Sequence, residues 1–106
     1  MIKLRIDERQ AQQTYLFSLQ TERGTKVDFE RLSHKTVGGA LKAVGKLFSH
    51  PMSRLSLLDA ISSGAKYAVL EDSMNGDRVV YKEHIRDFLE KYSSPETLDY
   101  LDSAYD

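Results

Sequence analysis

The chain contains 106 residues, of which 41% are apolar and 29% charged, with a formal net charge of -1 and no cysteine. This length and composition predict a single small globular domain, and the absence of cysteine excludes disulfides, thiolate nucleophiles and Cys-ligated zinc. The sequence has neither a signal-peptide pattern at its start nor an apolar run of about 20 residues, so we expect a cytoplasmic protein without a membrane span.

The first third of the chain alternates between apolar and polar side chains, which is the pattern of half-buried strands. This alternation over residues 2–7, 15–20 and 26–30 predicts three strands. Gly24 lies in the turn that joins the last two, where its freedom to adopt a positive φ suits a tight connection. The three strands are expected to form an antiparallel meander with one apolar face.

Residues 36–49 change to helical spacing, with apolar side chains that recur every three or four positions. Thr36 is a suitable N-cap, and a proline two residues beyond this segment is expected to end the helix. A second helix is predicted over residues 53–63, with Ser53 as its N-cap and Gly64 directly after its end.

The second half of the chain begins with the clearest local signal in the sequence. Two β-prone runs within residues 66–82 flank Asn75-Gly76, a dipeptide typical of hairpin turns. Residues 83–92 then have helical spacing. The remaining residues, 95–106, start with a proline and are strongly acidic, so we expect a short acidic helix or a tail.

The predicted order of elements is βββ-αα-ββ-α-α, which belongs to the α+β class. We expect residues 1–106 to form one domain, in which the helices pack on one face of a mostly antiparallel sheet. The sequence leaves open whether the two hairpins share one sheet.

The residues that usually carry chemistry occur here without a recognisable arrangement. The histidines His34, His50 and His84 are far apart and lack the spacing of a metal motif, so turn or cap positions are expected for them. The chain also lacks a Gly-x-Ser-x-Gly elbow and an established phosphate-binding loop. We therefore predict no metal, no cofactor and no catalytic activity.

The helix predicted over residues 36–49 is unusual because it contains three glycines, each of which costs about 1 kcal/mol relative to alanine. The glycines leave one side of this helix almost without side chains, apart from two lysines. Such a side allows another backbone to approach closely, either within the molecule or between subunits. The alternative is an anion site at the helix start, beside Lys35.

Of these alternatives, we favour close packing, and we predict that the glycine-lined side contacts a partner. The apolar side of the acidic C-terminal segment is a second candidate surface. The predicted partner-binding residues are Gly38, Lys42, Gly45, Lys46, Leu98 and Leu101. On this hypothesis, the substitution Gly45→Leu leaves the fold intact and abolishes the contact with the partner or the dimer.

A second function is suggested by the order of elements over residues 53–92, where a helix and a glycine are followed by a hairpin and another helix. In this order, residues 57–92 are similar to the helix-turn-helix modules of excisionase-like proteins, and the resemblance implies DNA binding. The cations available for such binding are Arg54, Lys66, Arg78 and Lys82. The hairpin also carries Glu71, Asp72 and Asp77, whose charge opposes phosphate binding.

Charge is distributed unevenly along the chain. Residues 1–60 carry ten Lys or Arg against six Asp or Glu, whereas residues 61–106 carry five against ten. This asymmetry, the glycine-lined helix and the lack of a catalytic arrangement predict a small non-catalytic regulatory protein that acts through protein–protein contact. The partner is expected to be another protein or a second copy of this chain, as in a bacterial, plasmid or phage accessory factor.

Overall fold

The computed structural model describes residues 12–105, and the strand predicted over residues 2–7 lies outside this range. The described chain forms four strands, four α-helices and one turn of 3₁₀ helix. In chain order these are β1 (Gln13–Thr21), β2 (Lys26–His34), α2 (Val37–Leu47), α3 (Pro51–Ser62), β3 (Ala65–Asp72), η1 (Ser73–Asn75), β4 (Arg78–His84), α4 (Ile85–Tyr92) and α5 (Pro95–Tyr105). The predicted α+β class is confirmed.

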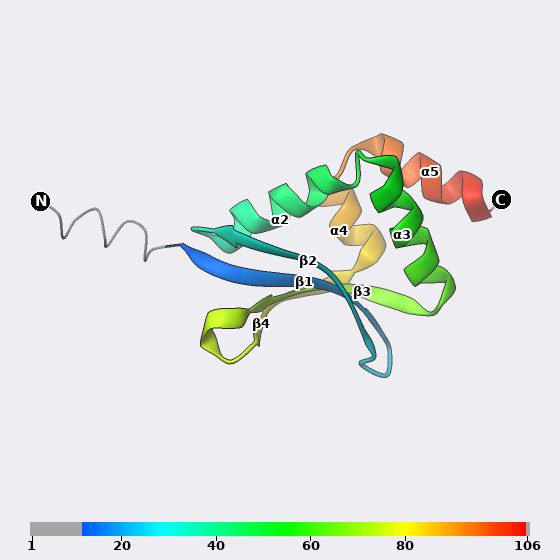
Figure 1. Ribbon diagram of the computed structural model, residues 1–106. Coiled ribbons are helices and arrows are strands. Elements are labelled where there is room, and N and C mark those ends of the chain that lie inside the picture. The colour runs from blue at the N-terminus through cyan, green and yellow to red at the C-terminus, as the bar shows by residue number, and fades with distance from the viewer. Residues whose placement is uncertain (1–11, 106) are drawn as a thin grey trace, which may run out of the picture.

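All four strands belong to one antiparallel sheet with the order β2-β1-β3-β4 (Figure 1). The two hairpins therefore share a sheet, because β1 pairs with β2 on one side and with β3 on the other. Phe17 of β1, for example, lies opposite Glu30 of β2 and Leu70 of β3. Within the described chain, β2 and β4 are consequently the two edge strands.

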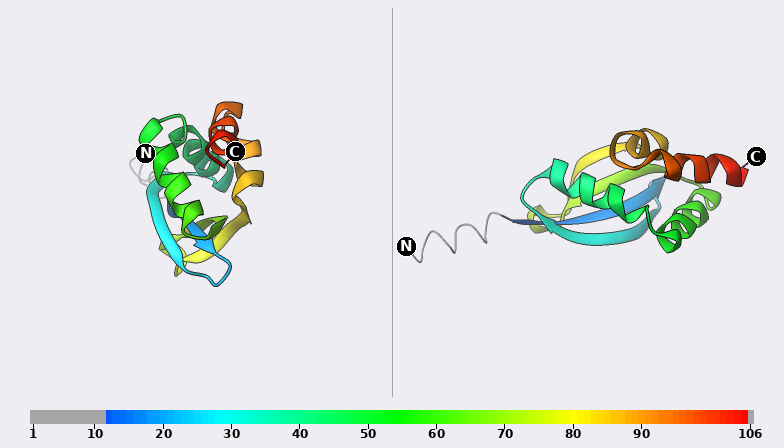
Figure 2. Two further views of the ribbon diagram at one scale, coloured as in Figure 1. Left: turned by 90° about the vertical axis from the view of Figure 1, so that its right-hand side faces the viewer. Right: turned by 90° about the horizontal axis from the view of Figure 1, so that it is seen from above.

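The helices lie on one face of this sheet, as predicted (Figures 1 and 2). Tyr15, Phe17 and Leu19 alternate along β1, and all three are buried in the core on this face. Leu41 and Val44 of α2 belong to the same core. The period-two spacing of β1 and the helical spacing of α2 thus direct their apolar side chains into one layer.

Four phenylalanines occupy the centre of this layer. The ring centroids of Phe17 and Phe88 are 5.3 Å apart, and those of Phe29 and Phe48 are 5.2 Å apart. Phe17 also contacts Phe29 and Phe48 in edge-to-face geometry. Each such pair contributes about 0.5–1.5 kcal/mol beyond the burial of its area, so the cluster joins β1, β2, the C-cap of α2 and α4.

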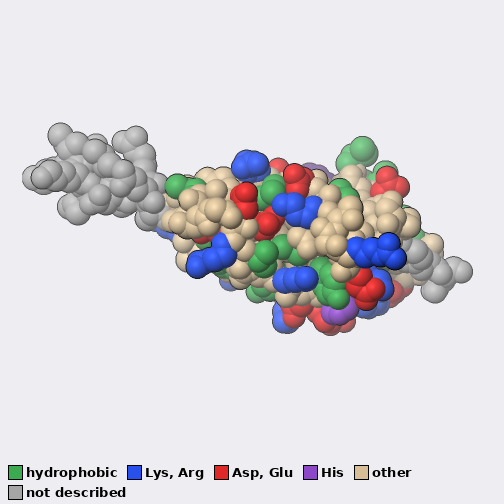
Figure 3. Space-filling view, turned by 90° about the horizontal axis from the view of Figure 1, so that it is seen from below, with side chains coloured by type: hydrophobic (Ala, Val, Ile, Leu, Met, Phe, Trp, Pro, Cys, Tyr) green, Lys and Arg blue, Asp and Glu red, His purple; other side chains and the backbone are tan. Residues whose placement is uncertain are grey.

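The other face of the sheet carries no helix of the described chain (Figure 1), and Figure 3 shows basic, acidic and apolar side chains intermixed on it. Ser18 and Val69 lie opposite each other at the centre of this face, and both are 0% exposed. The Nζ atom of Lys26 on β2 lies 2.7 Å from Oε1 of Glu71 on β3. Because β1 runs between these strands, the ion pair links β2 to β3 across their shared neighbour.

The start of α2 follows the sequence prediction, but the start of α3 does not. The Thr36 hydroxyl accepts a hydrogen bond of 3.0 Å from the backbone N–H of Gly39, which makes Thr36 the N-cap of α2. Helix α3 begins at Pro51, with His50 as its N-cap, so the prediction that Ser53 caps it is wrong. Proline tolerates the first helical position because the N–H that it lacks has no partner there.

The predicted hairpin is confirmed as β3 and β4, joined by a longer connection than a two-residue turn. The Asp72 carboxylate accepts hydrogen bonds from Met74 N at 3.1 Å and from the Asn75 side chain at 2.6 Å. Gly76 and Asp77 then adopt positive φ values of 73° and 57°. Glycine adopts such a φ without the steric cost that a Cβ brings, which explains its place in the turn.

The last two helices differ from the prediction mainly at their starts. Helix α4 begins at Ile85, because residues 83 and 84 still pair with β3 as part of strand β4. The segment predicted as a short acidic helix or a tail is a helix through Tyr105, with Pro95 as its first residue. Leu101 is 4% exposed and fixes α5 to the core.

Candidate functional site

The glycine-lined side of α2 is partly internal. Gly45 is buried against the end of α4, and a Cβ at this position would lie 1.9 Å from the carbonyl oxygen of Tyr92 and 2.6 Å from its carbonyl carbon. The glycine is therefore needed for the close approach of two helices within the molecule. The contact with Tyr92 accounts for the glycine within the molecule, and a partner contact at Gly45 stays a prediction.

The other predicted partner-binding residues do not form one surface. Gly38, Lys42 and Lys46 are exposed on α2, whereas Leu98 is half-buried and Leu101 belongs to the core. Helices α2 and α5 extend toward opposite ends of the molecule (Figures 1 and 2). Leu101 thus packs within the molecule, its partner contact stays a prediction, and the exposed α2 residues form a separate candidate surface.

The four cations proposed for DNA binding are also dispersed. Arg54 donates from Nε to the Phe48 carbonyl at 2.6 Å, and Lys66 pairs with Glu22 at 3.5 Å. Arg78 lies opposite Asp72, on the helix-covered face of the sheet, whereas Lys82 lies opposite Val69 on the other face. The hairpin that carries Lys66, Arg78 and Lys82 is moreover part of the four-stranded sheet and does not project as a separate wing.

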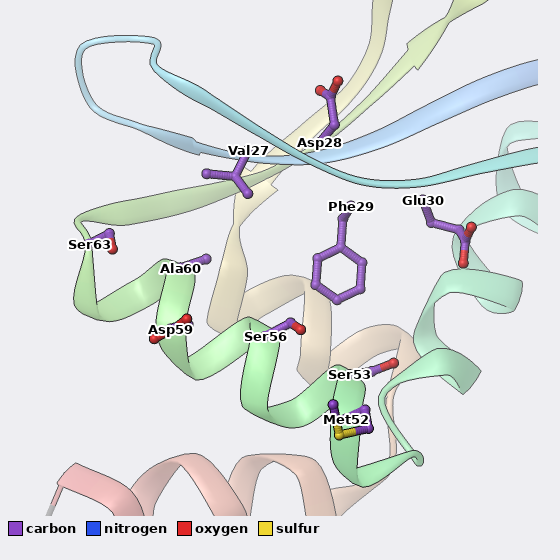
Figure 4. Close-up of a pocket in the computed structure, with 10 residues that line it drawn as sticks. All are labelled: Val27, Asp28, Phe29, Glu30, Met52, Ser53, Ser56, Asp59, Ala60 and Ser63. Atoms are coloured by element: carbon purple, nitrogen blue, oxygen red, sulfur yellow. The ribbon is translucent and has the colours of Figure 1, made fainter.

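A groove of about 500 Å³ separates the edge strand β2 from α3 (Figure 4). Strand β2 contributes residues 27–30, and α3 contributes Met52, Ser53, Ser56, Asp59, Ala60 and Ser63. None of the lining residues was singled out as a binding residue by the sequence. Its volume exceeds those of two other cavities in the described chain, of about 380 and 320 Å³.

Two local features of the sequence create this groove. Opposite Phe17 and Ser18, the register of β2 passes from Glu30 to Asp28, so that Phe29 is the extra residue of a β-bulge. A bulge redirects the side chain that it carries, and the Phe29 ring points toward α3 (Figure 4). The facing positions of α3 are mostly serine and alanine, which are too small to close the space.

The groove has a mixed lining, in which polar and acidic residues outnumber apolar ones. Phe29 and the buried Ala60 form part of the floor, whereas Glu30 and Asp59 bring two carboxylates to the lining. Asp28, the third acidic residue, points away from α3 (Figure 4). No Lys, Arg or His lines the groove, and within residues 12–105 none of the three carboxylates forms an ion pair.

Large apolar side chains lie exposed at the same edge of the molecule. Met52 and Leu55 of α3 are 72% and 53% exposed, and Val27 of β2 is 44% exposed. The sequence does contain a signal for this, because the apolar residues of α3 are spread around the helix and not gathered on one side. Apolar residues that remain exposed on a helix beside a groove are typical of a contact surface.

A smaller cavity of about 320 Å³ lies between the end of α3 and the starts of β3 and α4, beside α5. Its charged residues already have partners in the described chain. Arg86 donates to both carboxylate oxygens of Asp102 at 2.8 and 3.0 Å, and Lys66 pairs with Glu22. This cavity therefore offers fewer free groups to a ligand than the groove beside β2.

Three ionisable groups of the other edge strand, β4, and of α4 are hydrogen-bonded to one another. Glu83 accepts hydrogen bonds from Lys91, at 2.6 Å, and from the Tyr81 hydroxyl. These two hydrogen bonds lower the pKa of Glu83, and the bond to Glu83 raises the pKa of Lys91. Burial raises the pKa of Tyr81, with a further contribution from its hydrogen bond to Glu83.

The histidines lie apart in the structure. His50 and His84 are the N-cap residues of α3 and α4, and His34 ends β2. Within residues 12–105, no three His, Asp or Glu side chains form a group that could hold a metal ion. No helix in this part of the chain has both the length and the apolar character required to cross a bilayer.

Comparison of the chain with protein-family models, with curated proteins and with solved structures found no match. The functional argument consequently depends on the geometry of the groove and its surroundings.

Proposed function

We propose that this protein acts by binding another protein and that it makes or breaks no covalent bond. The contact is made at the β2 edge, by the groove between β2 and α3. A regulatory role as a small accessory factor fits such a mode of action, because the available surface suits recognition and needs no reactive group.

The observation that carries this proposal is the open groove beside an edge strand. Phe29, Ala60, Met52 and Val27 provide apolar surface inside it, and Leu55 adds exposed apolar surface on α3. Burial of such surface drives most protein association, and an edge strand offers unpaired backbone groups at the same place. A partner that covers the groove would gain both contributions at once.

DNA binding is less well supported by the geometry. Affinity for nucleic acid depends on several cations that contact phosphates together. Arg54 is engaged with a backbone carbonyl, and Arg78 and Lys82 lie on opposite faces of β4. We therefore expect no shift of mixed duplex DNA in a gel at low salt.

The proposal is tested by affinity capture with a variant whose groove is filled. Ser56 is exposed on α3 and points toward β2 (Figure 4), so Ser56→Trp should fill the groove without entering the core. Ser103→Trp places the same side chain on an exposed position of α5 and serves as the matched control. Immobilised wild-type protein and both variants are exposed to a lysate of the cells that make the protein, and bound proteins are quantified by mass spectrometry.

We expect at least one protein that the wild type and Ser103→Trp retain equally and that Ser56→Trp loses by about tenfold or more. A partner retained equally by all three would contradict the assignment to the groove. In that case, Lys42→Glu and Lys46→Glu would test the exposed side of α2 instead. Failure of the wild type to enrich any protein would contradict the proposed function itself.

A further inference from the structure

We infer that the groove binds an extended peptide segment with alternating apolar and basic residues, which pairs with β2 as a fifth strand of the sheet. This inference rests on the proposed function, since it specifies the kind of partner and its mode of binding.

The position of the groove indicates an extended partner. It runs alongside residues 27–30 of β2, and within the described chain β2 pairs with β1 only. A strand added to this edge would lie about 4.8 Å from β2 and would hydrogen-bond to its outer backbone groups on either side of the bulge at Phe29. Every second side chain of the added strand would then point toward α3, into the groove.

The length and lining of the groove indicate which side chains of the added strand it can accommodate. Four residues of a strand span about 13 Å, which is enough for two side chains of the partner on the groove side. Phe29 and Ala60 offer these side chains an apolar floor, and three serines of α3 offer hydroxyl groups at the rim. The methylene stems of lysine or arginine suit such a surface, so we place the basic residues of the segment on the groove side and its apolar residues on the opposite side of the strand.

The negative charge of the groove lining favours basic residues in the partner segment. Glu30 and Asp59 belong to the lining, no cation faces them there, and neither forms an ion pair in the described chain. A lysine or arginine of the partner would supply the missing charge, with its stem over the apolar floor. Charge complementarity thus favours a basic segment and disfavours an acidic one.

A second copy of this chain is a poorer occupant by the same reasoning. A two-fold contact presents the same patch on both sides of the interface. Two β2 edges would therefore bring Glu30 and Asp59 of one copy close to the same carboxylates of the other, with repulsion between like charges as the consequence. We accordingly expect the protein to remain monomeric when its β2 edge is free.

The inference is tested with fluorescein-labelled nonapeptides of defined pattern, titrated with the full chain and followed by fluorescence anisotropy. The main probe is GVKVKVKVG, which alternates valine and lysine. GVVKKKVVG has the same composition without the alternation, and GVEVEVEVG replaces the basic residues with acidic ones. Two further peptides repeat the main probe with N-methyl groups on all valines or on all lysines.

We expect GVKVKVKVG to bind about tenfold or more tightly than either GVVKKKVVG or GVEVEVEVG. Because alternate N–H groups of a strand point to the same side, one pattern of N-methylation should abolish binding and the other should leave most of it. The protein variant Asp59→Lys should weaken binding about tenfold, whereas the matched variant Asp99→Lys, exposed on α5, should leave it unchanged.

Equal binding of all basic peptides, or binding that survives both patterns of N-methylation, would overturn strand addition. Absence of binding by GVKVKVKVG would overturn the inference as well. If Ser56→Trp still lost a captured protein in that case, the proposed function would stand and only the extended mode would fail. Sedimentation that showed a wild-type dimer and a monomeric Ser56→Trp variant would identify a second copy as the occupant and contradict the inference.

Discussion

The two edges of the sheet differ in what lies between the strand and its neighbouring helix. Beside β4, the ring of Tyr81 lies 6.1 Å from that of Phe88 and 6.2 Å from that of Tyr92, so that aromatic side chains of α4 fill the space. Beside β2, the Phe29 ring points toward α3, whose serines and alanine leave a groove. The size of the residues on the covering helix therefore decides whether an edge is closed.

The charges at the two edges differ in the same sense. Glu83 of β4 is hydrogen-bonded to Tyr81 and Lys91, whereas Glu30 of β2 and Asp59 of α3 have no ion-pair partner among residues 12–105. Glu83 thus has its partners within the molecule. Glu30 and Asp59 are the carboxylates that would pair with the partner that we propose.

The largest effect is expected at Gly45, where α2 meets the end of α4 on the closed side. In Gly45→Leu the new Cβ would lie 1.9 Å from the Tyr92 carbonyl oxygen, so the two helices must separate. We expect loss of most of the free energy of unfolding, which is about 5–15 kcal/mol for small proteins. Urea denaturation followed by circular dichroism measures this loss.

Gly38→Ala provides the control for that experiment. Gly38 is exposed on the same helix, and a Cβ there would meet no atom within 4 Å. Because alanine favours the helix, this variant should be up to about 1 kcal/mol more stable than the wild type. A folded, fully stable Gly45→Leu protein would show that the two helices do not pack this closely.

The next largest loss of stability is expected when one phenylalanine near each edge of the sheet is replaced by alanine. Phe88 is 1% exposed in the closed layer, so Phe88→Ala should cost about 3–5 kcal/mol. Phe29 is only half-buried and borders the groove, so Phe29→Ala should cost clearly less, about 2 kcal/mol. Chemical denaturation of both variants gives the two values, and equal losses would remove the distinction that we draw between the edges.

A smaller effect is expected from the hydroxyl of Tyr81 at alkaline pH. Its folded-state pKa is raised above the ordinary value of 10.0, chiefly by burial. The contribution of the neutral Tyr81 hydroxyl to the free energy of unfolding is therefore fully present below about pH 10, and it is lost as the pH rises toward the raised pKa. In Tyr81→Phe, the fall in thermal stability above pH 10 should be shallower, although Tyr15, whose pKa is also raised, will retain part of it.

Glu83 should show the opposite dependence. Its pKa is lowered from 4.5 by the hydrogen bonds of Lys91 and Tyr81, so its contribution is present above about pH 4.5 and is lost as the pH falls. Melting temperatures between pH 3 and 7 should decline less for Glu83→Gln than for the wild type. Glu90→Gln, an exposed position on α4, is the control and should follow the wild type.

Much of the fold could be predicted because its signals are local. The cap at Thr36, the hairpin around Gly76 and the strand alternation of β1 each depend on residues close together in the sequence. The errors at Ser53 and at residue 83 concern the start of a helix. There a proline at the first helical position, or strand pairing with β3, outweighs the expected cap or spacing.

The groove could not be predicted in this way, because it depends on which strand lies at the edge. That is decided by the pairing of β1 with β3, between residues about fifty positions apart. The role of Gly45 has the same origin, since its neighbour Tyr92 is distant in the sequence. The presence of glycine inside a helix, where it is unfavourable, correctly indicated a close contact. The spacing of apolar residues, however, does not distinguish a neighbour within the molecule from one in a partner.

The central position of β1 also has a consequence for how the chain acquires its structure during synthesis. The β1–β2 hairpin involves neighbouring residues and can form early, whereas the second side of β1 stays vacant until residues 65–72 have left the ribosome. Until then, the nascent chain exposes the unpaired backbone edge of what later becomes an interior strand. Chaperone protection of this intermediate would matter most in the interval between the two pairings.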